Sequence, residues 1–346
     1  MSLENKSMPY VRLGKSGLKV SKIILGCMSY GSKGWSEWVI DDQEEVTKHI
    51  KYAYDHGIQT FDTADAYSHG LSEVMLGKAI NELKLPREEL VILTKIYFPI
   101  APEYDMNICY MKPEDFGVIN QKGLNRKHIF DSVKKSLERL QVDYIDVLQC
   151  NRFDYDTPIE ETMQALHDVV QAGYVRYVGM SSCHAYQFHA MQNYAIQNKL
   201  TPFISMQNHH SLVYREEERE MFPTLKMFGV GAIPYSPLGR GTLTRPLSAQ
   251  TKRGENDVFI GPYSTWAGTP DIVIRVEELA GKKGVSMAQV AIAWSLAKDD
   301  VTAPIVGATS LKNLEDIIGA INVELTPDEI KHLEEPYKPL AVCGHV

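Results

Sequence analysis

"YIDVLQCNRFDYDTPIEE", residues 144–161, contains the unit that decides the fold. Its apolar first part, 144–150, is typical of a buried strand, and its last residues are typical of the start of a helix. Asn151 and Arg152 lie between the two, at the carboxyl tip of the strand. One strand followed by one helix is the βα unit from which parallel sheets are built.

The same alternation extends over nearly the whole chain. Strands are predicted at 23–28, 60–65, 90–96, 144–150, 175–181, 203–209, 231–237 and 302–308. Helices are predicted near 42–56, 71–84, 126–141, 158–172, 185–199, 215–228, 271–282 with 286–298, and 311–320. Strands that are apolar throughout and separated by single helices indicate parallel βα units. Eight such units predict an α/β fold, the closed (β/α)8 TIM barrel.

Chain length supports a single barrel. At 346 residues, with 44% hydrophobic content, the chain is long for one domain unless that domain is an α/β barrel, so we expect one domain over residues 1–346. The alternative is a doubly wound open sheet, which normally carries a glycine fingerprint after its first strand. Residues 25–34, LGCMSYGSKG, do not match that fingerprint.

Three segments interrupt the repeat. Residues 10–23 are typical of a hairpin that turns at Lys15–Gly17, which we expect to plug the bottom of the barrel. The connections 97–125 and 239–270 are long and follow strands, on the face where barrel enzymes place their chemistry. Loops of this length are usually lids or binding loops, or they are disordered.

Composition excludes several classes of protein. The net charge of −8 and pI near 5.8 argue against nucleic-acid binding. The five cysteines are widely spaced, so neither a disulfide framework nor a zinc or other metal site is predicted, and a reducing compartment fits best. The N-terminus lacks the apolar core of a signal peptide and no run is long enough for a membrane span. We expect a soluble, cytoplasmic protein with a small-molecule substrate, no membrane contact and no implied protein partner.

Polar residues at the strand tips are candidates for chemistry. They are Asp62, Asp65, Tyr67, Lys95, Asn151, Arg152, Ser181, Ser182, Gln207, Asn208, His209, His210, Tyr235 and Ser236. Tyrosine can act as a general acid when a lysine ammonium eases its proton loss and a carboxylate holds the lysine. Tyr67, Lys95 and Asp62 supply these three parts. Each alone also has an ordinary structural interpretation, but Asp and Lys inside buried strands need partners, which favours function.

Two segments in the second half of the chain are typical of a binding site for an anion-bearing cofactor. Gly239–Gly241 forms a flexible turn after the seventh strand, and residues 304–316 lead from the eighth strand into a helix N-terminus. Phosphate sites recur at these two places in barrel enzymes. Arg240 and Lys312 are possible phosphate partners, although Lys312 is equally well interpreted as a solvated helix residue.

Several motifs together resemble the aldo-keto reductases. They are LGKSGLKVSKIILGCMSYG, FDTADAYSHGLSEVMLGKAI, VILTKI, YVGMSSCHAYQ, MQNHHSLVYREEEREMFP, IPYSPLGRGTLTRP and PIVGATSLKNLEDIIGA. The chain is most similar to the branch that holds fungal aryl-alcohol dehydrogenase-like reductases and the β subunits of voltage-gated potassium channels. The resemblance covers Val11 to Leu333 in unbroken order.

This resemblance implies a barrel that binds NADPH (NADP+) across its mouth, with NADPH preferred over NADH, passes hydride to a carbonyl carbon and protonates the oxygen from Tyr67. Asp62 and Lys95 match two further catalytic positions. The positions that match cofactor-binding residues are Met28 beside the first strand; Ser181, Ser182 and Gln207 at the carboxamide; Tyr235 stacked on the nicotinamide; Ser236, Pro237, Leu238, Gly239 and Arg240 at the pyrophosphate; and Gly307, Thr309, Lys312, Asn313 and Asp316 near the adenosine ribose.

The fourth catalytic position departs from the family. Most active reductases have His where this chain has Asn151, and the channel β subunits, regarded as slow reductases, have Asn. An amide donates a hydrogen bond but cannot titrate, so we expect a lower rate and a weaker pH dependence. Alternatively, Asn151 is merely tolerated and Tyr67 suffices.

The sequence therefore predicts an NADPH-dependent reductase of aldehydes or ketones. Its substrate pocket is expected to be framed by Tyr30, Trp35, Trp38, Tyr97, Asn151, Arg152 and the 97–125 loop, which favours aryl or apolar substrates. The rival hypothesis is a nicotinamide-sensing regulatory protein, which Asn151 alone favours. Reduction of an activated C=C bond would need a protonated acid at position 151.

Overall fold

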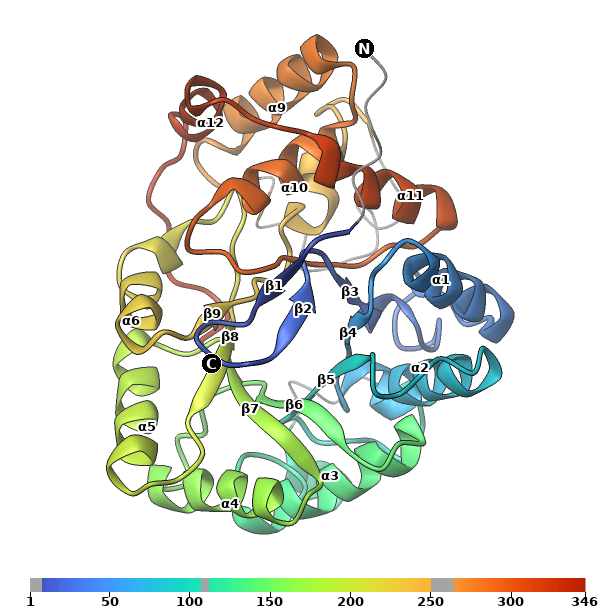
Figure 1. Cartoon of the computed structure of the whole chain (residues 1–346), viewed down its shortest axis with the longest axis vertical. Coiled ribbons are helices and arrows are strands. Elements are labelled where there is room, and N and C mark those ends of the chain that lie inside the picture. Colours follow the sequence, from blue (N-terminus) through green and yellow to red (C-terminus); the bar gives the residue numbers. More distant parts are fainter. Residues whose placement is uncertain (1–7, 107–111, 250–262, 264, 346) are drawn as a thin grey trace.

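Eight short parallel strands form one sheet at the centre of the molecule (Figure 1). The structure is a computed structural model that describes residues 8–106, 112–249, 263 and 265–345. The strands are β3 (Ile24–Gly26), β4 (Thr60–Asp62), β5 (Val91–Ile96), β6 (Ile145–Cys150), β7 (Val175–Ser181), β8 (Phe203–Gln207), β9 (Gly231–Ala232) and β10 (Ile305–Val306). Their order is β10-β3-β4-β5-β6-β7-β8-β9, so the first and last strands of the chain repeat are neighbours.

Backbone hydrogen bonds close this sheet into a barrel. The Thr302 amide donates to the Ala232 carbonyl over 2.8 Å, and the Ile305 amide donates to the Pro234 carbonyl over 2.8 Å. These bonds join β10 and the segment that enters it to β9 and the segment that follows it, at the opposite end of the strand order. Closure leaves no free edge, so the predicted (β/α)8 barrel is confirmed.

Helices surround the barrel on its outside (Figure 1). They are α1 (Gln43–Asp55), α2 (Leu71–Glu82), α3 (Arg126–Leu140), α4 (Ile159–Gln171), α5 (Ala185–Gln197), α6 (Met221–Phe228), α9 (Thr269–Lys283), α10 (Met287–Ala297), α11 (Leu311–Gly319) and α12 (Pro327–Glu334). α6 starts later than predicted because residues 216–218 form a separate 3-10 turn, and α12 was not predicted. Among the described residues, no helix combines the length and apolar character needed to cross a bilayer.

The predicted hairpin at the start of the chain is confirmed. β1 (Tyr10–Arg12) pairs antiparallel with β2 (Lys19–Ser21). Leu13 and Val20 belong to a buried cluster with residues of β3, β5, β6 and β10 and of the segments beside β9 and β10, namely Ile24, Val91, Leu93, Val147, Ile233, Ala303 and Ile305. The hairpin therefore covers the amino-terminal end of the barrel and leaves the carboxyl ends of the strands to form the site (Figure 1).

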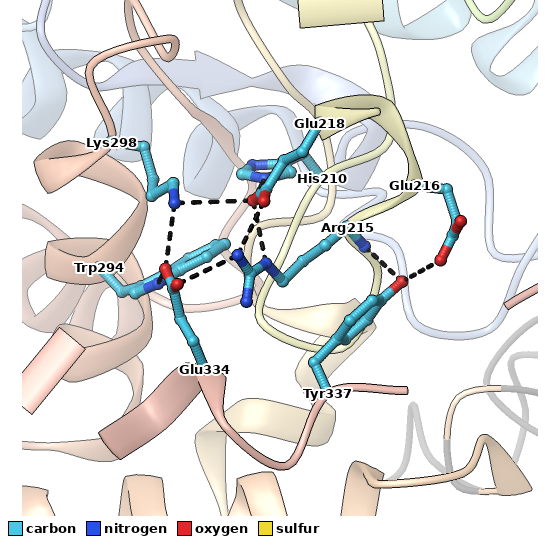
Figure 2. Close-up of polar contacts among 8 residues, drawn as sticks. All are labelled: His210, Arg215, Glu216, Glu218, Trp294, Lys298, Glu334 and Tyr337. Carbon is cyan, nitrogen blue, oxygen red and sulfur yellow. Dashed lines mark hydrogen bonds and ion pairs between the residues drawn. The ribbon is translucent and has the colours of Figure 1, made fainter. Parts of the chain in front are cut away.

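A largely buried charged network fixes the segment that follows β8. Figure 2 shows Glu218 between His210, Arg215 and Lys298, and Glu334 between Arg215, Lys298 and the Trp294 indole. The Arg215 guanidinium donates to Glu218 over 2.7 Å and to Glu334 over 3.0 Å, and the His210 ring lies 2.9 Å from Glu218. Since Glu334 ends α12 and Lys298 follows α10, the network ties three distant segments together.

This network predicts a loss of stability in acid. Although burial opposes it, hydrogen bonds from His210 and Arg215 lower the pKa of Glu218 from 4.5 to about 2. A lowered folded-state pKa stabilises the protein above pH 4.5 and the contribution is lost as the pH falls toward 2; it amounts to about 3 kcal/mol at neutral pH. We expect Glu218→Gln to lower the free energy of unfolding by about 1–3 kcal/mol at pH 7, and by progressively less below pH 4.5.

Urea unfolding at pH 7, 5, 4 and 3 measures this effect. Glu278→Gln, at an exposed position of α9, is the matched control and should follow the parent protein at every pH. Equal losses for Glu218→Gln at pH 7 and pH 3 would show that the charge of Glu218 contributes nothing.

Candidate active site

A cavity of about 1180 Å³ opens at the carboxyl ends of the strands. Asp62, Tyr67 and Asn151 line one part of it, and Thr309 and Asp316 line another. The lining residues come from most of the barrel strands and from the loops that follow them, which is where barrel enzymes hold their substrates. Eight of the fourteen polar strand-tip residues named from the sequence line this cavity, whereas six do not: Asp65, Lys95, Ser182, Asn208, His209 and His210.

A buried lysine lies at the centre of the polar group that includes Asp62 and Tyr67. Lys95, on β5, is 1% exposed. Its ammonium donates to Asp62 over 2.6 Å, to the Thr63 carbonyl over 2.8 Å and to the Tyr67 hydroxyl over 3.2 Å. All three ammonium protons are therefore used, and the phenol is held in a single position beside a positive charge.

Two glutamines complete the surroundings of Asp62. The side-chain amides of Gln149, on β6, and Gln207, on β8, donate to the second Asp62 oxygen over 3.0 and 2.8 Å. The sequence prediction assigned Gln207 to the cofactor and missed Gln149. The signal was present, because Gln149 is a polar residue inside a fully buried strand, as Asp62 and Lys95 are.

Electrostatics keep the lysine charged and the tyrosine protonated. Burial disfavours the Lys95 charge, but the Asp62 carboxylate and the Tyr67 hydroxyl outweigh it, so the pKa of Lys95 is raised. Burial raises the pKa of Tyr67, while Lys95 and Arg152 pull it down. Lys95 thus acts in the predicted direction, but burial is the larger effect. The group can present a neutral phenol that donates a proton into the cavity.

Asn151 and Arg152 form the wall next to Tyr67. The Asn151 backbone N–H donates to the Ile96 carbonyl over 2.9 Å, which continues the β5–β6 ladder by one residue. The Asn151 side chain lines the cavity and has no hydrogen-bond partner among the described residues. Arg152 donates to the Asn151 carbonyl over 2.6 Å, and its guanidinium lies 5.5 Å from the Phe98 ring centre.

Ser181, Gln207 and Tyr235 also line the cavity. Tyr235 is supported from behind, since its ring is nearly parallel to that of His209 at 5.3 Å and its hydroxyl lies 3.2 Å from the Ser182 hydroxyl. Ser182 itself does not line the cavity. This arrangement offers amide and hydroxyl groups beside a flat ring face, which suits a planar ring with a carboxamide.

The loop after β9 has the features of a phosphate site. Ser236, Gly239, Arg240 and Gly241 all have positive φ angles, between 52° and 98°. Pro237, Leu238, Arg240 and Gly241 line the cavity, and Gly239 lies behind them. Arg245 also lines it, and burial lowers the pKa of its guanidinium. Guanidinium groups beside a turn of left-handed residues fit the phosphates of a dinucleotide.

The far end of the cavity is formed around β3, β10 and α11. Met28, Gly307, Thr309, Asn313 and Asp316 line it. Gly307 has a tight environment, since a Cβ there would lie 3.1 Å from the Ser29 hydroxyl and 3.3 Å from the Gly26 carbonyl. Lys312 is exposed and is not among the lining residues. The structure therefore fits the interpretation of Lys312 as a solvated helix residue better than its interpretation as a phosphate partner.

Aromatic residues border the cavity near Tyr67. Trp35, Trp38 and Phe98 line it, and the two tryptophan rings meet edge to face at 6.3 Å. Tyr97 lies behind Phe98, with the ring centres 5.2 Å apart. Tyr30 departs from the sequence prediction, because it is 0% exposed in the core, contacts His49 and does not line the cavity. The sequence prediction named the 97–125 loop but not Phe98 within it, and it did not name Arg245.

Known proteins are similar to this chain over most of its length. The model of the "Aldo/keto reductase family" matches residues 22–338. The chain is 48% identical to a Schizosaccharomyces pombe protein named provisionally as an aryl-alcohol dehydrogenase, over 97% of this chain and 98% of the relative. It is 47% identical to the versiconal hemiacetal acetate reductase of Aspergillus parasiticus, over 97% and 98%. It is 42% identical to the aldo-keto reductase AFTS1 of Alternaria alternata, over 97% and 93%.

Proposed function

Because the chain belongs to the aldo/keto reductase family and is an oxidoreductase of carbonyl and alcohol groups, we propose that it is an NADPH-dependent reductase of aryl or apolar aldehydes and ketones. The observation that carries this proposal is the Lys95 ammonium held between Asp62 and the Tyr67 hydroxyl at the wall of a large cavity. The enzymes of this family use NADH or NADPH. Arg240 and Arg245 beside the cavity can pair with the pyrophosphate that both cofactors carry, and the choice of NADPH over NADH is part of this proposal.

Each residue of the site has a separate role in the proposed reaction. The bound cofactor supplies the hydride. Tyr67 donates its hydroxyl proton to the carbonyl oxygen, and the phenolate that results is stabilised by the Lys95 ammonium 3.2 Å away. Asp62 keeps Lys95 in place and is itself held by Gln149 and Gln207. The aromatic wall of Trp35, Trp38 and Phe98 excludes water and favours a flat, apolar substrate.

Asn151 orients the substrate in this proposal. Asn151 lines the cavity, and its side-chain N–H can donate to the carbonyl oxygen that Tyr67 protonates, which helps to polarise the carbonyl. The amide cannot gain or lose a proton near neutral pH. The proton therefore comes from Tyr67 alone, and the rate should vary little with pH in the neutral range.

The parent protein should oxidise NADPH when aromatic aldehydes are added, and Asn151→His should raise kcat by about tenfold. An imidazole that relays a proton as well as donating a hydrogen bond gains about 1.4 kcal/mol in the transition state, which corresponds to that factor. The variant should also become pH-dependent near the ordinary histidine pKa of about 6.5. NADPH absorbance followed over a panel of aldehydes, from mildly acidic to mildly alkaline pH, measures both effects.

The control is Asn198→His, at an exposed position after α5, which should leave the rate unchanged. Turnover by Asn151→His without any by the parent would contradict the enzyme proposal for the native chain. That outcome is what the rival regulatory hypothesis predicts.

A further inference from the structure

The turn that follows the proton donor has an unusual backbone. Ser68 and His69 have φ/ψ angles of 46°/43° and 49°/42°, and Gly70 has a φ of 94°. Residues with a side chain rarely adopt this left-handed region, and two in succession are rarer still. Such a conformation persists only where the surrounding contacts hold it, and these outliers cluster at functional sites. The contacts of Ser68 and His69 therefore indicate what the turn is for.

Ser68 holds the loop that carries the two tryptophans. Its hydroxyl is buried and accepts the Ser32 backbone N–H over 3.0 Å. The approach is so close that a Cβ on Gly31 would overlap the Ser68 hydroxyl, so glycine is required at position 31. Residues 31–38 follow this contact and carry Trp35 and Trp38 to the cavity wall.

His69 holds the loop on the other side. It is 2% exposed, its Nδ1 accepts the Ala101 backbone N–H over 3.0 Å, and its Nε2 bonds to the Met106 carbonyl. Because Nδ1 accepts, the ring proton is on Nε2 and donates to Met106. Burial lowers the pKa of His69, so the neutral ring that makes both bonds is the form present near neutral pH. Residues 97–106 are thus held by one imidazole.

The two loops also meet each other. The Ser32 hydroxyl donates to the Asp105 carboxylate, and a Cβ on Gly34 would lie 2.5 Å from the Asp105 carboxyl carbon. Phe98, three residues before Ala101, lines the same cavity as the tryptophans. One short turn, which begins with Tyr67, therefore anchors both aromatic walls at a fixed distance from the proton donor.

We propose that His69 is a positioning residue that sets substrate selectivity, because it fixes the 97–106 loop and so holds Phe98 against the aryl group of the substrate. This inference rests on the proposed reductase function. A loop released from His69 still leaves Tyr67, Lys95 and the cofactor side of the cavity in place. The reduction of small aliphatic aldehydes does not depend on the aromatic wall, so its kcat/KM should change little when the loop is released.

His69→Gly tests this role, since glycine accepts the left-handed backbone and removes only the imidazole. For an aromatic aldehyde such as benzaldehyde we expect kcat/KM to fall about tenfold, mainly through KM, whereas for propanal it should change less than about twofold. The dissociation constant of NADPH, measured by protein fluorescence, should stay within about twofold. Hydrogen exchange of the Ala101 amide should become at least about tenfold faster.

Lys84→Gly is the matched control, because Lys84 also has a positive φ, 52°, but is exposed and away from the cavity. It should change neither selectivity nor Ala101 exchange. Parallel loss on both aldehydes, or unchanged Ala101 exchange, would overturn the inference. If the parent reduces no aldehyde at all, the proposed function is wrong, and the proposed role of His69 in substrate selectivity is wrong with it. The hydrogen exchange of the Ala101 amide then still tests whether His69 holds the 97–106 loop.

Discussion

Tyr67→Phe should lower kcat/KM for aldehyde reduction by about a thousandfold while the dissociation constant of NADPH stays within about twofold. Loss of a positioned general acid typically costs between about 10² and 10⁴ in rate. The phenyl ring fills the same space, so the substitution removes only the hydroxyl that lies 3.2 Å from the Lys95 ammonium. Steady-state NADPH oxidation gives the rate, and fluorescence titration gives cofactor affinity.

Two comparisons make this result interpretable. Tyr194→Phe, on α5 and away from the cavity, removes a hydroxyl without touching the site and should keep full activity. The loss in Tyr67→Phe should appear in kcat, because the proton is transferred only in the reaction step. Full activity in Tyr67→Phe would show that another group donates the proton, and the site assignment would then be wrong.

The fold could be predicted because most strand positions are apolar on both faces and the strands alternate with helices along the chain. The strand ends were less predictable. Residues 231–237 were predicted as one strand, but β9 contains only Gly231 and Ala232. Pro234 explains part of the difference, because it has no N–H for a ladder hydrogen bond. Pro304 has the same effect just before β10.

The site could be predicted where a polar residue interrupts a buried strand. Asp62 and Lys95 gave that signal, and their charged groups lie 2.6 Å apart in the structure. Aromatic residues gave no such signal, since a tyrosine fits a core as well as a pocket, and Tyr30 belongs to the core. His69 could not be identified from the sequence, because its role depends on a left-handed backbone and on partners 32 and 37 residues away.

Lys95→Met should both inactivate the protein and destabilise it by about 3–5 kcal/mol. Lys95 and Asp62 are 1% and 3% exposed at their side chains and form a buried ion pair. Removing one partner leaves the other charge in a poorly solvated site, which is the costly way to break such a pair. Methionine has a similar length and leaves little cavity. Urea unfolding at neutral pH measures the stability, and NADPH oxidation measures the activity.

The double variant Asp62→Asn with Lys95→Met separates the two roles of the lysine. The asparagine introduced at position 62 carries no charge, and its side-chain oxygen can still accept from Gln149 and Gln207, so most of the lost stability should return. Activity should not return, because no ammonium is left to stabilise the Tyr67 phenolate after proton transfer. If the double variant regains activity together with stability, Lys95 serves only to hold the fold, and Tyr67 needs no positive neighbour to act as a proton donor.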